Sequence, residues 1–240
     1  MIKISFFTPF FLFFIWTADA LAQTETYLAL YKEQLPYFQE LISGGQYQEP
    51  PLNYEGHPYY QSRTFGEGML SINKITYTEV PLLYDENADM VVTFHPIYRQ
   101  KILIKPEKIE EFQLEDGSVF RRFERKDHYS NHKNGFYRIL KDGEIKVVLK
   151  HYKYTEPTNE IGKYTHRYEA QKQYFYLFNG DFVPINKKNQ AIKNLGLSKR
   201  EVKKGMKSQS LYFSLNREKY ILELANIREA KSEPFNGFAQ

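Results

Sequence analysis

Short apolar runs alternate with turn residues through most of the chain, a pattern that predicts an antiparallel β-sheet. The runs are rich in Tyr, Phe, Val and Ile, which favour strands. Ten of them are Gly68–Lys74, Ile75–Tyr84, Met90–Phe94, Gln100–Ile104, Ile109–Leu114, Ser118–Phe123, Gly135–Leu140, Ile145–Tyr152, Gln173–Phe178 and Phe182–Ile185. Because no helical pattern separates these runs, parallel βαβ units are not expected.

Three dipeptides between these runs are typical of tight hairpins. They are Asp116-Gly117, Asp142-Gly143 and Asn179-Gly180. Such dipeptides accept the positive φ angles that two-residue hairpin turns require. The sequence therefore predicts a mainly β (α+β) fold, in which an antiparallel meander forms a sandwich or a partly open barrel.

Helical spacing of apolar residues replaces the strand pattern after residue 185. The expected helices run from Asn186 to Leu195, from a capping box at Ser198–Glu201 onward, and from Asn216 to Glu229. A further short helix is expected at Thr24–Leu35, ended by Pro36. We expect a single β-rich domain over residues 23–230, with a helical C-terminal section at about 186–229 and a disordered tail at 231–240.

The first 22 residues have the order of a secretory signal peptide. A positive charge at Lys3 precedes an apolar run to Trp16, and Ala20 and Ala22 form an A-x-A site before Gln23. The apolar run is shorter than the roughly 20 residues that span a bilayer. We expect cleavage after Ala22 and a mature protein that is exported to the periplasm or secreted.

The amino-acid composition excludes several kinds of site and partner. Aromatic residues make up 17% of the chain, and cysteine is absent. Without cysteine the protein has no disulfide, no cysteine-linked lipid anchor, no thiol nucleophile and no zinc–thiolate site. The net charge of +4 is too small to indicate nucleic acid as a partner. No second apolar run predicts a membrane span once the leader is removed.

The sequence has no complete motif for a metal site or a serine nucleophile. Asp85–Asp89 begins like a calcium loop, but the required glycine and bidentate glutamate are Met90 and Pro96, which favours an acidic turn. His128 and His132 stand four apart in a segment typical of a loop. No G-x-S-x-G elbow occurs. We expect no catalytic residue, metal ligand or cofactor to be recognisable from sequence.

Two groups of residues remain as candidate binding sites. His57, Tyr59 and Tyr60 form a dense cluster that could line a pocket, or whose rings could cap the sheet beside a turn set by Gly56 and Pro58. The second group is a basic face within the lysine-rich tract 187–207: Lys199, Arg200, Lys203, Lys204 and Lys207. Its alternative is a solvated helix face whose apolar side docks on the sheet.

Several segments together resemble a group of exported proteins of Bacteroidetes-type bacteria. The segments are Glu55–Tyr60, Val80–Asp85, Gly135–Leu140, Tyr174–Gly180 and Ser198–Lys204. The resemblance implies a signal peptide, a strand meander and a lysine-rich helical tail. It implies no activity and no catalytic residue.

These observations favour a non-catalytic binding or structural module of the cell envelope, whose partner would be an envelope protein or a polysaccharide. The alternative is a secreted hydrolase of glycans or esters, in which the fold brings Asp and Glu residues together. A third possibility is an accessory subunit of an envelope assembly.

Overall fold

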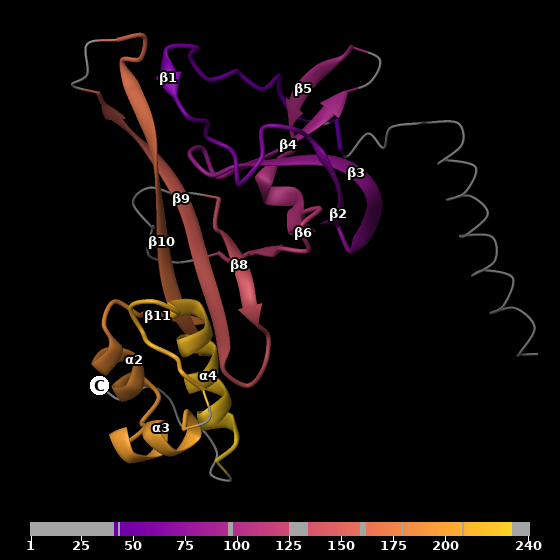
Figure 1. Cartoon of the computed structure of the whole chain (residues 1–240). Helices are drawn as coiled ribbons and strands as arrows, with labels where there is room; N and C mark the ends of the chain where they lie inside the picture. The colour runs from indigo at the N-terminus through magenta and orange to yellow at the C-terminus, as the bar shows by residue number, and fades with distance from the viewer. Residues whose placement is uncertain are drawn as a thin grey trace, which may run out of the picture.

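The protein folds around one large β-sheet, with short helices gathered at one end (Figure 1). The computed structural model describes residues 41–42, 44–95, 98–124, 134–158, 162–178, 180–207 and 209–231. Among the described residues, strands make up 44% and helical residues 17%, which confirms the mainly β class. The sheet is open rather than a closed barrel.

The strands match the apolar runs of the sequence closely. They are β1 (Tyr54–Glu55), β2 (Gly66–Ile72), β3 (Ile75–Asp85), β4 (Met90–His95), β5 (Gln100–Leu103), β6 (Ile109–Gln113), β7 (Val119–Arg122), β8 (Phe136–Lys141), β9 (Lys146–Pro157), β10 (His166–Phe178) and β11 (Asp181–Pro184). Two strands are longer than expected, because β9 continues five residues past Tyr152 and β10 begins seven residues before Gln173.

The sheet order is β1-β10-β9-β8-β7-β6-β2-β3-β4-β5, and β11 pairs with β10. All pairings are antiparallel except that of β1 with β10, which is parallel. The short β1 was not expected from sequence, where its residues belong to a turn-rich stretch. Register shifts between β2 and β3, β2 and β6, and β8 and β9 bend the sheet, as bulges do.

Turn chemistry explains how consecutive strands reverse. Gly117 and Gly180 adopt φ of +79° and +88°, as two of the hairpin dipeptides predict. Gly143 does not share this conformation, so the third dipeptide turns the chain in another way. The β2–β3 hairpin turns at Asn73-Lys74, where both residues have positive φ. That is the geometry of a tight turn whose twist matches the flanking strands.

Three α-helices follow the strands, as expected. They are α2 (Lys188–Asn194), α3 (Lys199–Gly205) and α4 (Arg217–Glu229), and a 3₁₀ turn η1 covers Pro106–Lys108. The capping box of α3 is confirmed, because Glu201 N donates to Ser198 Oγ at 3.3 Å and Ser198 N donates to Glu201 Oε2 at 2.7 Å. These bonds satisfy two backbone groups that a helix start leaves unpaired.

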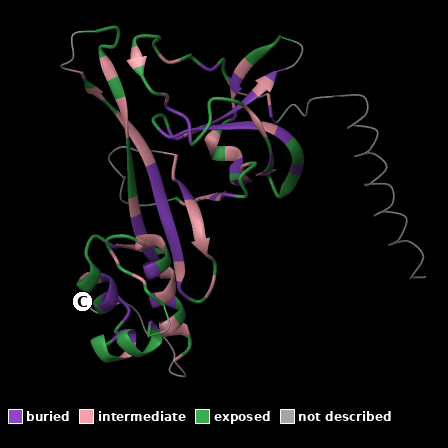
Figure 2. Cartoon of the chain, viewed as in Figure 1, coloured by how far each residue is buried: buried purple, intermediate pink, exposed green. Residues whose placement is uncertain are grey.

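Two large hydrophobic clusters lie at opposite ends of the molecule. One packs α2, α3 and α4 against the start of β9 and the end of β10, and its helical residues include Ile192, Leu195, Val202 and Met206. The other fills the curled part of the sheet with the rings of Tyr84, Phe112, Phe120 and Phe136, among others. Figure 2 shows that the part of β9 nearer the helices is buried, whereas its far part is intermediate or exposed.

Several sequence expectations fall outside the described residues. These are the leader 1–22 with its cleavage site, the helix at Thr24–Leu35, the tail from residue 232, and His128 and His132. Within the described residues, no helix combines the length and the apolar character needed to cross a lipid bilayer. The division of the mature chain into a single domain stays a prediction.

Candidate functional site

A hollow of about 780 Å³ opens on the helical end of the molecule. Its lining comes from α2, α3, the segment between α3 and α4, and α4: Lys188, Asn189, Ile192, Lys199, Val202, Lys203, Met206, Lys207, Gln209, Ser210, Leu211, Tyr212 and Tyr220. The volume falls in the usual range for small-molecule sites. We call this feature the lysine hollow.

The lysine hollow combines a cationic rim with an apolar floor. Four lysines line it, and no Asp or Glu is among its lining residues. Helical spacing explains part of the arrangement, because Lys199 and Lys203 stand four apart on one face of α3. Val202 and Met206, also on the lining, are buried between α3 and the rest of the helical section. A bound molecule would therefore meet positive charge at the rim and hydrocarbon beneath it.

Two acidic side chains of the helical section form ion pairs with lysines outside the hollow. Glu201 Oε1 lies 2.6 Å from Lys231 Nζ, and Glu229 Oε2 lies 2.9 Å from Lys141 Nζ. The Lys231 contact, together with bonds from Ser198, lowers the pKa of Glu201 to about 2. In the part of the chain that the structure describes, none of the four lysines of the hollow lies within ion-pair distance of a carboxylate.

The molecule is also polarised as a whole. Residues 186–231 hold twelve Lys and Arg side chains against four Glu, a net charge of +8. The whole chain has a net charge of +4, so the remaining residues together have a net charge of −4. This asymmetry directs anionic partners toward the helical end.

The structure brings together part of the basic face expected from sequence. Lys199, Lys203 and Lys207 line the hollow, whereas Arg200 and Lys204 are exposed on α3 outside it. Lys188 completes the rim, with its ammonium 5.5 Å from the ring centroid of Tyr220. It belongs to the same lysine-rich tract, but the sequence pattern did not single it out.

A second polar region lies where the β3–β4 turn meets β9. The turn residues Asp85, Glu86 and Asp89 are buried rather than solvated. Glu86 lies between two basic residues of β9, with its carboxylate oxygens 3.2 Å from His151 Nδ1 and 3.3 Å from Lys153 Nζ. The acidic turn therefore connects the β3–β4 hairpin to β9, and its buried carboxylates are not exposed to bind a cation from solvent.

Asp89 and Lys150 form the most deeply buried ion pair of this region. Lys150 Nζ donates to Asp89 Oδ1 at 2.9 Å and to the carbonyl of Phe136 at 2.6 Å. Tyr84 Oη and Gly135 N also donate to the Asp89 carboxylate, at 2.7 and 2.9 Å. Burial lowers the pKa of Lys150 to about 8, although Asp89 favours the charged form.

His57, Tyr59 and Tyr60 lie beside this polar region. The carbonyls of His57 and Tyr59 accept hydrogen bonds from Lys153 Nζ at 3.1 and 2.6 Å. Tyr59 and Tyr60 are buried, and the Tyr60 ring packs edge-on against His151 with 5.0 Å between centroids. The cluster thus joins the segment before β2 to β9, and Tyr60 also lines a small pocket beside Glu115 and Asp116.

Stability is expected to fall as the pH drops below about 6.5, because folding lowers the pKa of His151. Burial lowers the pKa of His151, against the opposing effect of Glu86, and its Nε2 has no partner within the described residues. The unfolded chain, with an ordinary histidine pKa near 6.5, then binds a proton that the folded chain does not. Each such histidine contributes a slope of up to about 1.4 kcal/mol per pH unit.

Urea unfolding at a series of pH values from about 7.5 to 5 checks this expectation. His57, whose pKa burial also lowers, adds a second contribution of the same sign. His151→Gln should therefore flatten the pH dependence in part, whatever its effect on stability at pH 7.5. An unchanged slope in His151→Gln would show that the buried histidine takes no part.

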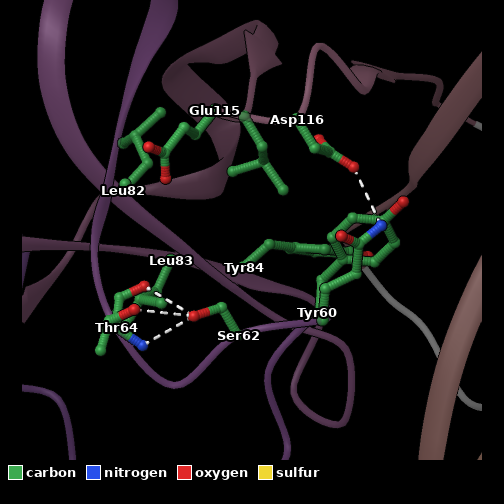
Figure 3. A pocket seen from close by; sticks show the side chains of 11 residues that line it. Tyr60, Ser62, Thr64, Leu82, Leu83, Tyr84, Glu115 and Asp116 are labelled. Atoms are coloured by element: carbon green, nitrogen blue, oxygen red, sulfur yellow. Dashed lines mark hydrogen bonds between the residues drawn. The ribbon is translucent and has the colours of Figure 1, made fainter.

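Figure 3 shows a smaller pocket that contains two carboxylates, from Glu115 and Asp116. Asp116 accepts hydrogen bonds from Ser118 N, Ser118 Oγ and Gln61 Nε2 at 2.8 to 2.9 Å. Partial burial alone would raise the pKa of Asp116, but these bonds outweigh it and hold the pKa below its ordinary value. A glycosidase acid requires a raised pKa, so Asp116 is poorly suited to that role.

The serine hydroxyl of this pocket is also engaged locally. Ser62 Oγ accepts from Thr64 N at 3.0 Å and lies 2.8 Å from Thr64 Oγ1 (Figure 3). None of the residues lining this pocket is a histidine or lysine that could act as a base toward Ser62. The pocket thus has the character of a hydrogen-bonded turn beside the sheet.

Among the described residues, no group of three or more His, Cys, Asp or Glu side chains could hold a metal ion. No family model, curated protein or solved structure matches the chain. The resemblance to exported proteins of Bacteroidetes-type bacteria stays a prediction. Function is therefore inferred from the side chains of this chain alone, and the lysine hollow is the feature most suited to recognition.

Proposed function

We propose that this protein is an exported, non-catalytic binding module of the cell envelope that holds an anionic ligand in the lysine hollow. One observation carries the proposal: four lysines that have no carboxylate partner among the described residues surround an apolar floor. The signal-peptide pattern of residues 1–22 supports export. The alternative of a secreted hydrolase has no comparable support, since the pKa of Asp116 in the carboxylate pocket is lowered, whereas a glycosidase acid needs a raised pKa.

The chemistry of the hollow defines its ligand class. Lysine ammonium groups act as point charges for phosphate, sulfate or carboxylate groups. The apolar floor adds affinity for a ligand that also has hydrocarbon or ring surface. Because the lysines are solvent-exposed, their attraction for an anion weakens as the salt concentration rises. An acidic polysaccharide and an anionic lipid both belong to this class.

Charge reversal within the hollow tests the proposal. The mature protein should bind polygalacturonate, an acidic polysaccharide, with an affinity that decreases with salt. The triple variant Lys199→Glu, Lys203→Glu, Lys207→Glu should bind at least 100-fold more weakly, since each lost cation near a polyanion is worth about 1 kcal/mol. Fluorescence anisotropy with a labelled oligosaccharide at low and moderate salt provides the measurement.

The matched control reverses three exposed lysines on the β portion of the molecule: Lys105→Glu, Lys163→Glu and Lys172→Glu. It changes the net charge by the same amount and should retain binding within about threefold, as expected when only screened, long-range charge is altered. Equal losses in the two triple variants, or no loss in either, would overturn the assignment of the site to the hollow.

A further inference from the structure

An exposed apolar pair stands at the edge of the lysine hollow. Tyr212 and Leu215 are 62% and 78% exposed, and Tyr212 is one of the lining residues. Both belong to a single turn, in which Leu215 N and Asn216 N donate to the Tyr212 carbonyl at 3.1 and 2.8 Å. Large apolar side chains held outward beside lysines are typical of surfaces that contact membranes or partners.

The turn is anchored from below. Phe213, between the two exposed residues, packs edge-on against Tyr220 of α4 with 5.6 Å between ring centroids. The Arg217 guanidinium lies 5.0 Å from the Phe213 ring, and it donates to the carbonyl of Asn186 at 3.2 Å. These contacts fix the backbone of the turn, so Tyr212 and Leu215 are presented without a large loss of entropy on binding.

We propose that the helical end docks on the surface of an anionic phospholipid membrane, with the hollow's lysines on headgroup phosphates and Tyr212 and Leu215 in the interface. The inference rests on the proposed function and names its ligand as a lipid headgroup. The exposed leucine decides between lipid and polysaccharide, because a hydrated glycan gives an aliphatic side chain no apolar surface to enter. Tyrosine suits the headgroup depth, since its ring is apolar and its hydroxyl is polar.

Charge distribution orients the molecule for this contact. The helical section has a net charge of +8 and the remainder of the chain −4, so an anionic surface attracts the helical end and repels the rest. Each lysine near such a surface contributes about fivefold in affinity at physiological salt, and removing the exposed apolar pair should cost about tenfold. The lysines thus attract the protein to the membrane surface, and the apolar pair slows its dissociation.

Vesicle co-sedimentation tests the inference with three mature proteins. The vesicles contain 30% phosphatidylglycerol in phosphatidylcholine, or phosphatidylcholine alone. The native protein should bind the anionic vesicles and leave the neutral ones unbound. Tyr212→Ser, Leu215→Ser should lose about tenfold in vesicle affinity. Because Tyr212 lines the hollow, affinity for polygalacturonate is compared in Leu215→Ser, whose position lies outside that lining and which should keep it. The control Leu52→Ser, Tyr98→Ser removes an exposed leucine and tyrosine elsewhere and should bind as the native protein does.

The outcomes separate this inference from the proposed function. Full vesicle binding by Tyr212→Ser, Leu215→Ser, or equal binding of the native protein to neutral vesicles, would overturn membrane docking and leave the lysine hollow as an anion site. Binding to polygalacturonate but not to anionic vesicles would point to an acidic polysaccharide instead. If the charge-reversal variant of Lys199, Lys203 and Lys207 still bound both polygalacturonate and anionic vesicles as the native protein does, the proposed function itself would be overturned.

Discussion

Asp89→Asn is expected to lower the free energy of unfolding by roughly 3 to 5 kcal/mol, the usual cost of removing one partner from a buried ion pair. Lys150 is fully buried, and its ammonium depends on Asp89 for its counter-charge. The carbonyl of Phe136, its other oxygen partner, supplies only a dipole. Asparagine has nearly the same shape as aspartate, so packing is kept, and the loss reports the missing charge together with the one hydrogen-bond acceptor that the amide lacks.

Urea unfolding of three variants checks this expectation. Asp142→Asn removes an exposed carboxylate that pairs with Arg121 and Lys146, and it should cost no more than about 1 kcal/mol. Asp89→Asn combined with Lys150→Met removes both charges and should recover much of the loss, because no uncompensated charge remains. If Asp89→Asn alone lies within about 1 kcal/mol of the native protein, the buried pair does not stabilise the fold as described.

Phe120→Ala should cost roughly 3 to 5 kcal/mol, because it opens a cavity in the cluster of aromatic rings. Phe120 is completely buried on β7. Its ring stacks on Phe112 at 5.0 Å between centroids and meets the rings of Tyr84 and Tyr60 at 4.9 and 5.2 Å. Alanine would remove all three ring contacts, and the surrounding strands cannot close the space without losing register.

Two further variants define what the Phe120 result means. Phe120→Leu fills most of the space, so it should lower the free energy of unfolding clearly less than Phe120→Ala does. That order is expected if the lost side-chain volume causes the effect. Tyr98→Ala removes a largely exposed ring and should stay within about 0.5 kcal/mol of the native protein. Equal stability of Phe120→Ala and Tyr98→Ala, measured by urea unfolding, would contradict the assignment of this ring to the core.

Sequence pattern predicted the strands well where apolar residues alternate or cluster. β3, β4 and β8 begin and end within one residue of their expected positions. The failures lie where tertiary pairing, not local pattern, makes the strand. The outer ends of β9 and β10 are rich in charged and polar residues and form strands because each pairs with the other. β1 exists only through its contact with the start of β10.

The buried polar region shows a second limit of sequence reasoning. Asp85–Asp89 was expected as an acidic turn between strands, and it does connect β3 to β4. Its burial depends on Lys150, His151 and Lys153, which stand about 60 residues later. The basic residues of β9 gave no local signal of this burial, because lysines in a strand are usually solvated.

The sequence predicted some of the lysines of the lysine hollow but not the cavity that they surround. The basic tract indicated Lys199, Lys203 and Lys207, but an excess of charge does not define a cavity. Packing of α2 and α4 against α3 supplies Lys188 and Tyr220, and the turn before α4 supplies Tyr212. Such a site needs the relative positions of helices, which periodicity alone does not give.

Lysine footprinting tests the central claim, that the hollow is the binding site, most directly. The mature protein is acetylated with acetic anhydride, with and without saturating polygalacturonate or anionic vesicles, and each lysine is quantified by mass spectrometry. We expect Lys188, Lys199, Lys203 and Lys207 to be protected, whereas Lys105, Lys163 and Lys172 react as before. Uniform protection, or protection confined to the β portion, would contradict the account.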